Sequence, residues 1–247
     1  MGFLSYNKLN LAFSMAEKKV SIIIPAYNEE KIIKGTIEVF KKLPYSPKEI
    51  IIVVNNSADK TFEIAKKYAD KALNFPGPIG VSAARNEGAG VAEGDVFLFS
   101  DADSRLSENA IEEIVRATTP STLGCCLGRG DNESLRGKLF FFFKNWMHRL
   151  RIYKGVVDGI LFCHRDIFFR TGGFNEAKRI AEFQDFTKRA FKNGGKYKLL
   201  RNCYAVISLR RYEEKGYIRI HLYWLRYKIA SLFKKEKKIA REYFKKK

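Results

Sequence analysis

The sequence predicts an α/β fold, in which a doubly wound, mostly parallel sheet carries helices on both faces and a basic helical tail follows. Short, nearly continuous apolar segments at residues 20–25, 50–54 and 96–100 are typical of parallel strands that are buried on both faces. Segments with apolar residues at helical spacing separate them, so strand and helix alternate along the first half of the chain. The length of 247 residues and the hydrophobic content of 46% fit one globular domain with a sizeable core.

The first half of the chain has the more regular pattern. We expect strands at residues 20–25, 50–54, 71–75 and 96–100, and helices at residues 31–42, 61–68 and 80–92. Pro25 ends the first strand because it has no N–H to donate to a strand ladder. Right-handed crossovers bring the carboxyl ends of such strands to one edge of the sheet, where open α/β sheets bind ligands.

The second half of the chain has a weaker pattern. We expect helices at residues 108–118, 135–151, 165–171 and 182–192, and strands at residues 122–128, 156–163 and 204–209. The helix at 135–151 mixes Phe140–Phe143 and Trp146 with lysine and arginine, as an interfacial helix does. The chain shows no internal repeat and no low-complexity linker. We therefore expect an N-terminal extension at 1–19, one domain at 20–212 and a basic tail at 213–247.

The net charge of +19 favours anionic partners, which include nucleotides, nucleic acid and an acidic membrane surface. About half of this charge belongs to residues 217–247, where eleven lysine or arginine residues stand against two glutamates. Leu222, Leu225 and Ile229 lie at helical spacing among these charges. The tail is therefore either an amphipathic helix on an anionic membrane or a helix packed on the domain with a solvated basic face.

The four cysteines show neither metal-ligand spacing nor a disulfide framework, which favours a reducing cytoplasm. No run of about eighteen apolar residues occurs, and the first nineteen residues lack the features of a secretory signal. We therefore expect a cytoplasmic protein. Peripheral attachment to the cytoplasmic face of the membrane stays open.

Two acids follow the strand at residues 96–100. Asp101 and Asp103 are separated by one small residue, and two carboxylates this close repel each other unless a proton or a cation lies between them. A hard divalent ion such as Mg²⁺ or Mn²⁺, bound by one or two carboxylates together with phosphate oxygens, would remove the repulsion. The alternative is an acidic turn before the helix that Ser107 and Glu108 begin. The motif alone leaves both interpretations open.

Four short motifs occur in one order along the chain. They are Pro25-Ala26-Tyr27-Asn28-Glu29-Glu30, Ala83-Ala84-Arg85-Asn86-Glu87-Gly88, Asp101-Ala102-Asp103 and Gly172-Gly173-Phe174-Asn175-Glu176. With these motifs the chain resembles the family 2 glycosyltransferases over about residues 20–212. The resemblance implies the GT-A fold and a nucleotide-activated sugar as the donor.

The resemblance also implies which residues bind the nucleotide-sugar donor. They are Pro25, Tyr27, Glu29, Arg85 and Asp101, of which Asp101 would also hold the metal on the diphosphate together with Asp103. A tyrosine can stack on a base with its hydroxyl hydrated, and an arginine presents a planar fork of donors. The metal would neutralise the charge that develops on the departing diphosphate. A loop anchor for Tyr27 and a solvated helix position for Arg85 are the structural alternatives.

The chain departs from the family pattern at two places. Asn55 stands where an acidic residue or pair usually follows the second strand, so the base that Asn55 would contact, uracil or guanine, stays open. Phe183 stands where the family often has an aspartate that acts as the general base. Glu182 or Asp185 could accept the proton of an acceptor hydroxyl instead. Alternatively, the acceptor is a phosphate, as in the polyprenyl-phosphate sugar synthases. The structural alternative is that Glu182 only caps the helix and Asp185 only pairs with Arg189, four residues on.

Arg210 and Arg211 are expected at the end of the last strand. The resemblance implies basic residues over the donor diphosphate in this region, where charge-assisted hydrogen bonds would complement the metal. A solvated rim or a membrane-facing pair of charges is the alternative.

These expectations describe a metal-dependent inverting glycosyltransferase, most simply a hexosyltransferase, that uses Mg²⁺ or Mn²⁺. It would transfer a sugar from a nucleoside-diphosphate sugar to a hydroxyl or a lipid-phosphate acceptor. A basic nucleic-acid-binding protein would explain the net charge of +19 but not the ordered motifs, and the chain has no helix-turn-helix or aromatic RNA-binding signature. A catalytically silent transferase-like protein stays open because of Asn55 and Phe183.

Overall fold

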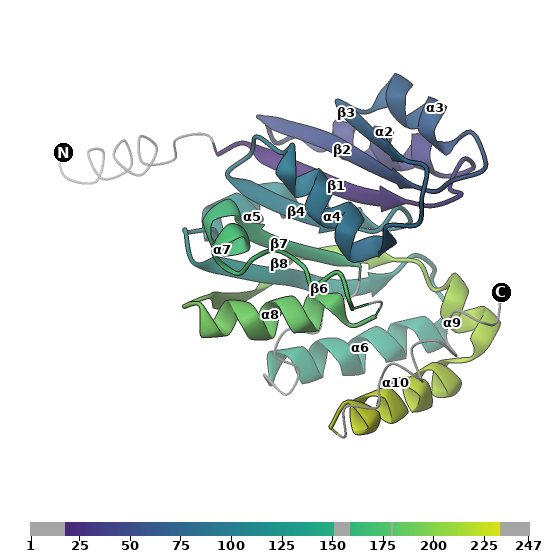
Figure 1. Ribbon diagram of the computed structural model, residues 1–247. Helices are drawn as coiled ribbons and strands as arrows, with labels where there is room; N and C mark the ends of the chain where they lie inside the picture. Colours follow the sequence, from purple (N-terminus) through teal and green to yellow (C-terminus); the bar gives the residue numbers. More distant parts are fainter. Residues whose placement is uncertain (1–17, 151–158, 179, 233–247) are drawn as a thin grey trace, which may run out of the picture.

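The computed structural model describes residues 18–150, 159–178 and 180–232, and it shows an eight-stranded sheet with helices on both faces (Figure 1). The strands are β1 (Val20–Ala26), β2 (Lys48–Asn55), β3 (Lys71–Phe75), β4 (Val96–Ser100), β5 (Arg105–Leu106), β6 (Thr122–Gly130), β7 (Ile160–His164) and β8 (Lys196–Ile207). The helices are α2 (Ile33–Lys42), α3 (Thr61–Tyr68), α4 (Gly80–Gly90), α5 (Ala110–Ala117), α6 (Leu135–Arg149), α7 (Arg165–Arg170), α8 (Glu182–Lys192), α9 (Arg210–Lys215) and α10 (Tyr217–Leu232).

The sheet has the strand order β3-β2-β1-β4-β7-β6-β8-β5. The first four of these strands pair in parallel, and so do β6 and β8. β7 is antiparallel to both of its neighbours, β4 and β6, and β5 is antiparallel to β8. Because β7 is antiparallel to both β4 and β6, strand β6 and its parallel neighbour β8 point the same way as β4. The carboxyl ends of β1, β2, β4, β6 and β8 therefore share one edge, which confirms the predicted mostly parallel, doubly wound sheet.

Each face of the sheet has its own hydrophobic core, because successive residues of a strand face opposite sides. Ile22 of β1 packs with the buried side chains of α2, α3 and α5. Ile23, the next residue, packs with the buried side chains of α4, α7 and α8. Both isoleucines are fully buried, which explains why these strands are apolar along their whole length instead of alternating.

The structure corrects the predicted elements in the second half of the chain. β8 begins at Lys196 and ends at Ile207, whereas the sequence predicted a strand at 204–209. Its first half is partly exposed and has lysines between apolar residues, so it lacks the continuous apolar pattern of the central strands. Strand β5 and helix α9 were not predicted, because β5 has only two residues and α9 has no buried residue that would give it an apolar pattern.

Several predicted segments extend beyond the described residues. The strand expected at 156–163 is described only from Gly159 on, where β7 forms, and residues 1–17 and 233–247 lie outside the described ranges. Helix α10 falls within the expected basic tail. The domain boundaries at 19/20 and 212/213 stay predictions. Within the described ranges, no helix is both long and apolar enough to cross a membrane.

Gly88 lets helix α4 pack closely on β1 and β2. A Cβ at this position would lie 2.5 Å from Ile23 Cγ2 and 3.0 Å from Val53 Cγ2, closer than carbon atoms can approach. We expect Gly88→Ala to lower the free energy of unfolding by about 1–3 kcal/mol, because an extra methyl in a packed core forces its neighbours to shift. Gly90→Ala is the matched control, because a Cβ there meets nothing within 4 Å. Equal urea midpoints for the two variants would contradict the prediction.

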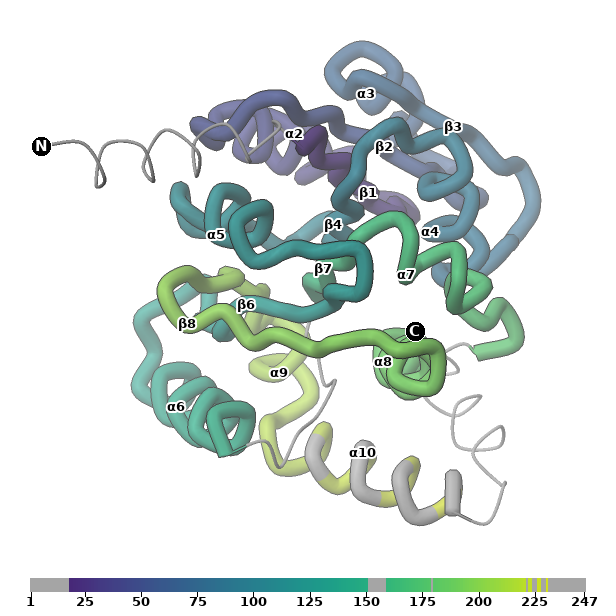
Figure 2. The backbone as a smooth tube through the Cα atoms, turned by 90° about the vertical axis from the view of Figure 1, so that its left-hand side faces the viewer, coloured from purple at the N-terminus to yellow at the C-terminus, as the bar shows by residue number. Residues whose placement is uncertain are grey.

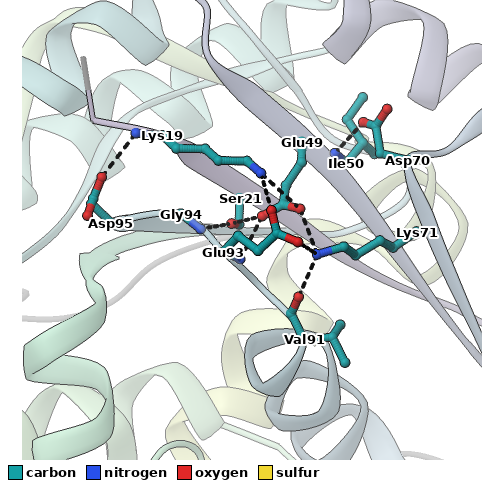
Figure 3. A network of polar contacts seen from close by, with 10 residues as sticks. All are labelled: Lys19, Ser21, Glu49, Ile50, Asp70, Lys71, Val91, Glu93, Gly94 and Asp95. Atoms are coloured by element: carbon teal, nitrogen blue, oxygen red, sulfur yellow. Dashed lines mark hydrogen bonds and ion pairs between the residues drawn. The ribbon is translucent and has the colours of Figure 1, made fainter.

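A network of charged side chains lies at the amino ends of the strands (Figure 3). Asp101, which follows β4, lies at the opposite edge of the sheet. Glu49 is 4% exposed and accepts a hydrogen bond from Ser21 at 2.6 Å, and its carboxylate lies 3.1 Å from Lys71 Nζ. Glu93 pairs with both Lys19 and Lys71 at 2.6 Å. The network therefore ties β1, β2 and β3 to the segment that enters β4.

This network makes stability depend on acid pH. The hydrogen bonds and charges of Lys19 and Lys71 lower the pKa of Glu93 from its ordinary 4.5 to about 2. Burial alone would raise the pKa of Glu49, but hydrogen bonds from Ser21 and the Glu93 N–H, with the nearby lysines, lower it. A carboxyl with a lowered pKa stabilises the fold above pH 4.5, and this contribution is lost as the pH falls toward about 2. We expect the melting temperature to fall less steeply across this window in Glu93→Gln than in the wild type. Parallel curves would contradict the expectation.

Candidate active site

Asp101 and Asp103 lie at the carboxyl end of β4 on a turn that main-chain hydrogen bonds fix. The Asp101 N–H donates to the Gly159 carbonyl at 2.8 Å, and the Ser104 N–H donates to the Asp101 carbonyl at 3.1 Å. Asp103 is exposed, and 44% of the Asp101 side-chain surface is accessible. Both carboxylates are thus presented at the edge where sheets of this kind bind ligands.

The surroundings of Asp101 fit a hard cation. Ser104 Oγ is buried beside Asp101 and has no hydrogen-bond partner among the described residues, which is costly unless another polar atom approaches it. Gly159 has φ +68°, and a Cβ there would lie 2.6 Å from Ser104 Oγ and 3.3 Å from Asp101 Oδ2. Carboxylate and other oxygens are the ligands that Mg²⁺ and Mn²⁺ prefer. The described residues contain no group of three or more acidic, histidine or cysteine side chains that could hold a metal, so a cation here would need further oxygens from a substrate.

Arg85 is the central cation of the site. It extends from α4, is 1% exposed, and donates to Glu182 Oε1 at 2.6 Å and to Asp101 Oδ1 at 2.7 Å. Its guanidinium carbon lies 4.2 Å from the centre of the Phe183 ring and 5.8 Å from that of Phe174. An arginine can be buried here because two carboxylates and two aromatic faces replace most of its hydration, although its Nε has no hydrogen-bond partner among the described residues. The predicted alternative of a solvated Arg85 is therefore wrong.

The pKa of Asp101 is raised. Enclosure of the carboxyl at the sheet edge is the largest cause, even though part of the side chain stays accessible, and the charges of Asp103 and Glu182 act in the same direction. Arg85 and Arg211 oppose the shift. Three carboxylates therefore stand close to one another, and a further positive charge beside Asp101 would relieve their repulsion.

The two acids considered as general base have different surroundings. Glu182 is the first residue of α8, its side chain is 14% exposed, and it points to Arg85. Asp185 accepts a hydrogen bond from Arg189 Nε at 2.8 Å, and Arg189 in turn donates to the Thr171 and Gly173 carbonyls, each at 2.7 Å. Asp185 thus braces the turn after α7, whereas Glu182 lies next to the aspartate turn.

Asn86 ties the Gly172-Gly173 turn to α4. Its Oδ1 accepts from the Phe174 N–H at 2.8 Å, and its Nδ2 donates to the Phe174 carbonyl and to Glu176 Oε1, both at 2.9 Å. Gly173 has φ +64°, and a Cβ there would lie 2.7 Å from Asn86 Oδ1. The sequence analysis quoted Asn86 in a motif but gave it no role. Its position next to Arg85 was the available signal.

The loops after β1 and β2 hold each other in place. Asn28 has φ 54°, its Oδ1 accepts from the Ala58 N–H at 2.9 Å, and its own N–H donates to Ser57 Oγ at 2.9 Å. The Glu29 N–H donates to Thr61 Oγ1, also at 2.9 Å. This pairing presents Tyr27, which is 49% exposed, two residues after the partly buried Pro25. Pro25, Tyr27 and Glu29 therefore lie together at the strand edge that carries Asp101.

Asn55 ends β2 and supports the start of α4. Its Oδ1 accepts a hydrogen bond from the Ile79 N–H at 3.0 Å, and Ile79 is the residue before the helix. Within the part of the chain that the structure describes, the amide nitrogen of Asn55 makes no hydrogen bond. Asn55 can thus donate to a ligand but has already used its acceptor.

Arg210 and Arg211 lie on helix α9, so the prediction that they end a strand is wrong. β8 stops at Ile207, and the Leu209 carbonyl then accepts the N–H groups of Tyr212 and Glu213, which starts the helix. Both arginines are exposed. Arg211 is close enough to Asp101 for its charge to lower the pKa of that carboxyl, which places it at the same edge of the sheet.

The family model for "Glycosyl transferase family 2" matches residues 21–170. Among curated relatives, the probable glycosyltransferase YdaM of Bacillus subtilis (strain 168) is 30% identical over 200 residues, which are 71% of this chain and 47% of the relative. A dolichol-phosphate mannosyltransferase of Pyrococcus furiosus is 30% identical over 148 residues, 56% of this chain and 39% of the relative. The chain thus spans about half the length of the curated relatives it matches.

Solved glycosyltransferases of the GT-A type share the fold. One is the mannosyltransferase PcManGT from Pyrobaculum calidifontis, solved in complex with GDP-Man and Mn²⁺. It matches this chain with a TM-score of 0.65 and 16% sequence identity, and the match covers 81% of this chain and 63% of the PcManGT chain. TarS 1–349 of S. aureus, in complex with UDP-GlcNAc, has a TM-score of 0.60 and 20% identity and covers 76% of this chain and 58% of its own. The predicted GT-A fold is therefore confirmed.

Proposed function

The chain belongs to glycosyl transferase family 2, and from that premise we propose that it is a metal-dependent inverting glycosyltransferase. It moves a sugar, most simply a hexose, from a nucleoside-diphosphate sugar to a hydroxyl or a lipid-phosphate acceptor. TarS binds UDP-GlcNAc, and PcManGT binds GDP-Man and Mn²⁺. Two curated relatives are named as transferases that use dolichol phosphate. These relatives support donors and acceptors of the same classes here.

The observation that carries the proposal is the buried Arg85 between Asp101 and Glu182 at the carboxyl edge of the sheet. Arg85 fixes the Asp101 side chain through Oδ1 and leaves Oδ2 for a cation. It also holds Glu182 at the start of α8. Arg85 thus fixes the distance between Asp101 on the donor side and Glu182 on the acceptor side before any substrate binds. Such preorganisation lowers the free-energy cost of reaching the transition state.

The proposal includes Mg²⁺ or Mn²⁺ held by Asp101 and Asp103. When bound, the ion would supply positive charge that neutralises the departing diphosphate. Two protein carboxylates are enough for such an ion, because diphosphate oxygens and water complete its coordination in sites of this type. The raised pKa of Asp101 is consistent with a site that is completed by its ligands, and so is the Ser104 hydroxyl, which has no hydrogen-bond partner in the described part of the chain.

The donor nucleotide would lie along the loops after β1 and β2. The exposed ring of Tyr27 offers a face for the base, with Pro25 and Glu29 beside it. Asn55 donates through its amide nitrogen, which suits a carbonyl oxygen on the edge of uracil or guanine. Arg211 and its neighbour Arg210 on α9 would bind the diphosphate, since the charge of Arg211 already acts on Asp101.

The acceptor would bind between the Gly172-Gly173 turn and Glu182. Glu182 takes the proton of an acceptor hydroxyl as that oxygen attacks the anomeric carbon from the face opposite to the diphosphate. Asp185 is the second candidate for this role. Both acids are ion-paired, but the partner of Asp185, Arg189, is bound to the turn after α7, whereas the partner of Glu182, Arg85, also binds Asp101. A phosphate acceptor is already ionised and needs no base, which would explain why Phe183 is tolerated in this place.

A thermal-shift panel tests the donor class. We expect one nucleoside diphosphate and its sugar conjugate to raise the melting temperature with Mn²⁺ and to raise it less without the ion. A radiolabelled transfer assay with that donor then tests the reaction. Metal-dependent binding without transfer to any hydroxyl or lipid-phosphate acceptor would favour the catalytically silent alternative. Steeply salt-dependent RNA binding with no sugar-nucleotide binding would overturn the proposal.

A further inference from the structure

Helix α6 and its C-terminal cap carry an apolar stripe that is open to solvent. Its members are large apolar side chains that are about half exposed or more: Leu135 (72%), Leu139 (49%), Phe142 (65%), Phe143 (58%), Trp146 (52%) and Leu150 (51%). Single exposed apolar residues are ordinary on a protein surface, but contiguous ones mark an interaction site. We call these six residues the α6 stripe.

The α6 stripe lies on the side of the helix that faces away from the sheet. At 3.6 residues per turn, its six positions project within an arc of about 100°. The buried residues of α6, which are Gly137, Phe141 and His148, project on the opposite side. Phe141 fills the space over Gly128, where a Cβ would lie 2.5 Å from its ring. One side of the helix therefore packs on the protein core, and the second apolar side is not buried by the fold.

The charged residues of helix α6 that border the α6 stripe are all basic. Arg136 lies along one edge of the stripe, and Lys138 and Arg149 lie along the other; all three side chains are exposed. Helix α6 contains no aspartate or glutamate. Long basic side chains at the edges of an apolar stripe can keep their stems in an apolar layer and their charges at its polar surface. The ion pair of Lys138 with Glu133 is exposed on both sides and therefore weak.

The α6 stripe lies near the edge of the sheet that carries Asp101. β6 points the same way as β4, so β6 ends with Gly130 at that edge of the sheet. Helix α6 begins five residues later, at Leu135. Helices α9 and α10 follow β8 at the same edge, and Phe140 of α6 contacts Tyr217 of α10 with ring centres 5.6 Å apart. Figures 1 and 2 both show α6 and α10 on the side of the molecule away from α2 and α3.

We propose that the α6 stripe, together with the exposed Ile218 and Leu222 of α10, inserts into the interfacial layer of an anionic lipid bilayer. Aromatic and leucine side chains on one face with arginine and lysine beside them are what such a layer binds. The net charge of +19 favours an anionic bilayer over a neutral one and over a second copy of this chain, which would bring like charges together. The proposal goes beyond glycosyl transfer and does not depend on it.

Vesicle binding by the full chain tests the proposal. We expect co-sedimentation with vesicles of phosphatidylglycerol and phosphatidylcholine, weaker binding to phosphatidylcholine alone, and a loss with rising salt. The double variant Phe142→Ser, Trp146→Ser should lower the partition coefficient by roughly tenfold or more, because two half-exposed aromatic side chains no longer enter the lipid. Phe169→Ser is the control for the loss of an exposed aromatic side chain elsewhere, because Phe169 on α7 is half exposed (50%).

A fluorescence measurement locates the contact. The chain has two tryptophans, so Trp224→Phe leaves Trp146 as the only reporter. Its emission should shift to shorter wavelength with anionic vesicles and be quenched by brominated lipid. The proposal would be overturned if Phe169→Ser weakened vesicle binding as much as the double variant does. It would also be overturned if the Trp146 emission of bound protein did not shift. A dimer in light scattering that the double variant converts to a monomer, without vesicle binding, would assign the stripe to a second copy instead. None of these readouts requires transfer activity, so the proposed function can fail separately.

Discussion

Arg85→Met is expected to lower the free energy of unfolding by about 3 kcal/mol, the largest effect on stability of any single change in the site. Removing one member of a buried charge cluster typically costs about 3–5 kcal/mol, because the remaining charges stay buried without a partner. Here the cost falls near the lower end, because 44% of the Asp101 side chain is accessible and can be hydrated. Glu182, at 14%, has less access to water and contributes most of the loss. Chemical denaturation at neutral pH measures the difference.

Arg116→Met is a closely matched control. Arg116 also bridges two carboxylates, at 2.7 Å to Glu112 and 2.6 Å to Glu113, but 56% of its side chain is exposed. Exposed ion pairs contribute little, so this variant should stay within about 0.5 kcal/mol of the wild type. If both variants lost the same stability, the burial of Arg85 would not matter as argued. Should Arg85→Met fail to fold, Arg85→Lys, which keeps the charge but reaches only one acid, allows the same comparison.

Asp103→Asn is expected to lower kcat/KM for sugar transfer by roughly a thousandfold without changing the melting temperature. The proposed cation stabilises the charge that develops on the diphosphate by several kcal/mol, and about 4 kcal/mol corresponds to three powers of ten in rate. Asp103 is exposed and makes no hydrogen bond or ion pair within the described residues, so its loss should not affect folding. The variant should also lose the part of the nucleotide-induced thermal shift that depends on Mn²⁺.

Glu108→Gln provides the control for the charge itself. Glu108 is exposed and lies shortly after Asp103, so its replacement removes the same charge from the same region without touching the proposed metal site. We expect its transfer rate and its Mn²⁺ dependence to match the wild type. Unchanged activity of Asp103→Asn, or an equal loss in both variants, would remove Asp103 from the metal site.

The first half of the fold could be predicted because β1, β2 and β4 are buried along almost their whole length and are therefore nearly continuous in apolar residues. The helix at 61–68 and the strand at 71–75 were predicted with the bounds that the structure has. The first half of β8 could not be predicted in the same way, because it is partly exposed and is fixed by pairing with β6 instead of by its own pattern. The reversal of β7 between two parallel groups is likewise a property of the whole sheet.

The candidate site could be predicted in its members but not in its contacts. The strand-end position of Asp101 follows from the apolar segment before it. The pairing of Arg85 with Glu182 joins residues 97 positions apart, and no local pattern reports a contact of that kind. Asn55 was predicted to bind the base, and in the structure its side-chain oxygen Oδ1 accepts a hydrogen bond from the Ile79 N–H at the start of α4. The roles of these residues toward a substrate stay predictions.

Arg85 and Asn86 are consecutive residues of one helix, yet they contact different parts of the site. Arg85 reaches Asp101, whereas Asn86 holds Phe174 and Glu176. Substitutions at separate sites usually change the free energy additively. Because one turn of α4 supports both sets of contacts, a change at Glu176 is expected to alter the effect of a change at Asp101, although the two acids share no contact. A double-mutant cycle would then give a coupling energy that belongs to the helix between them.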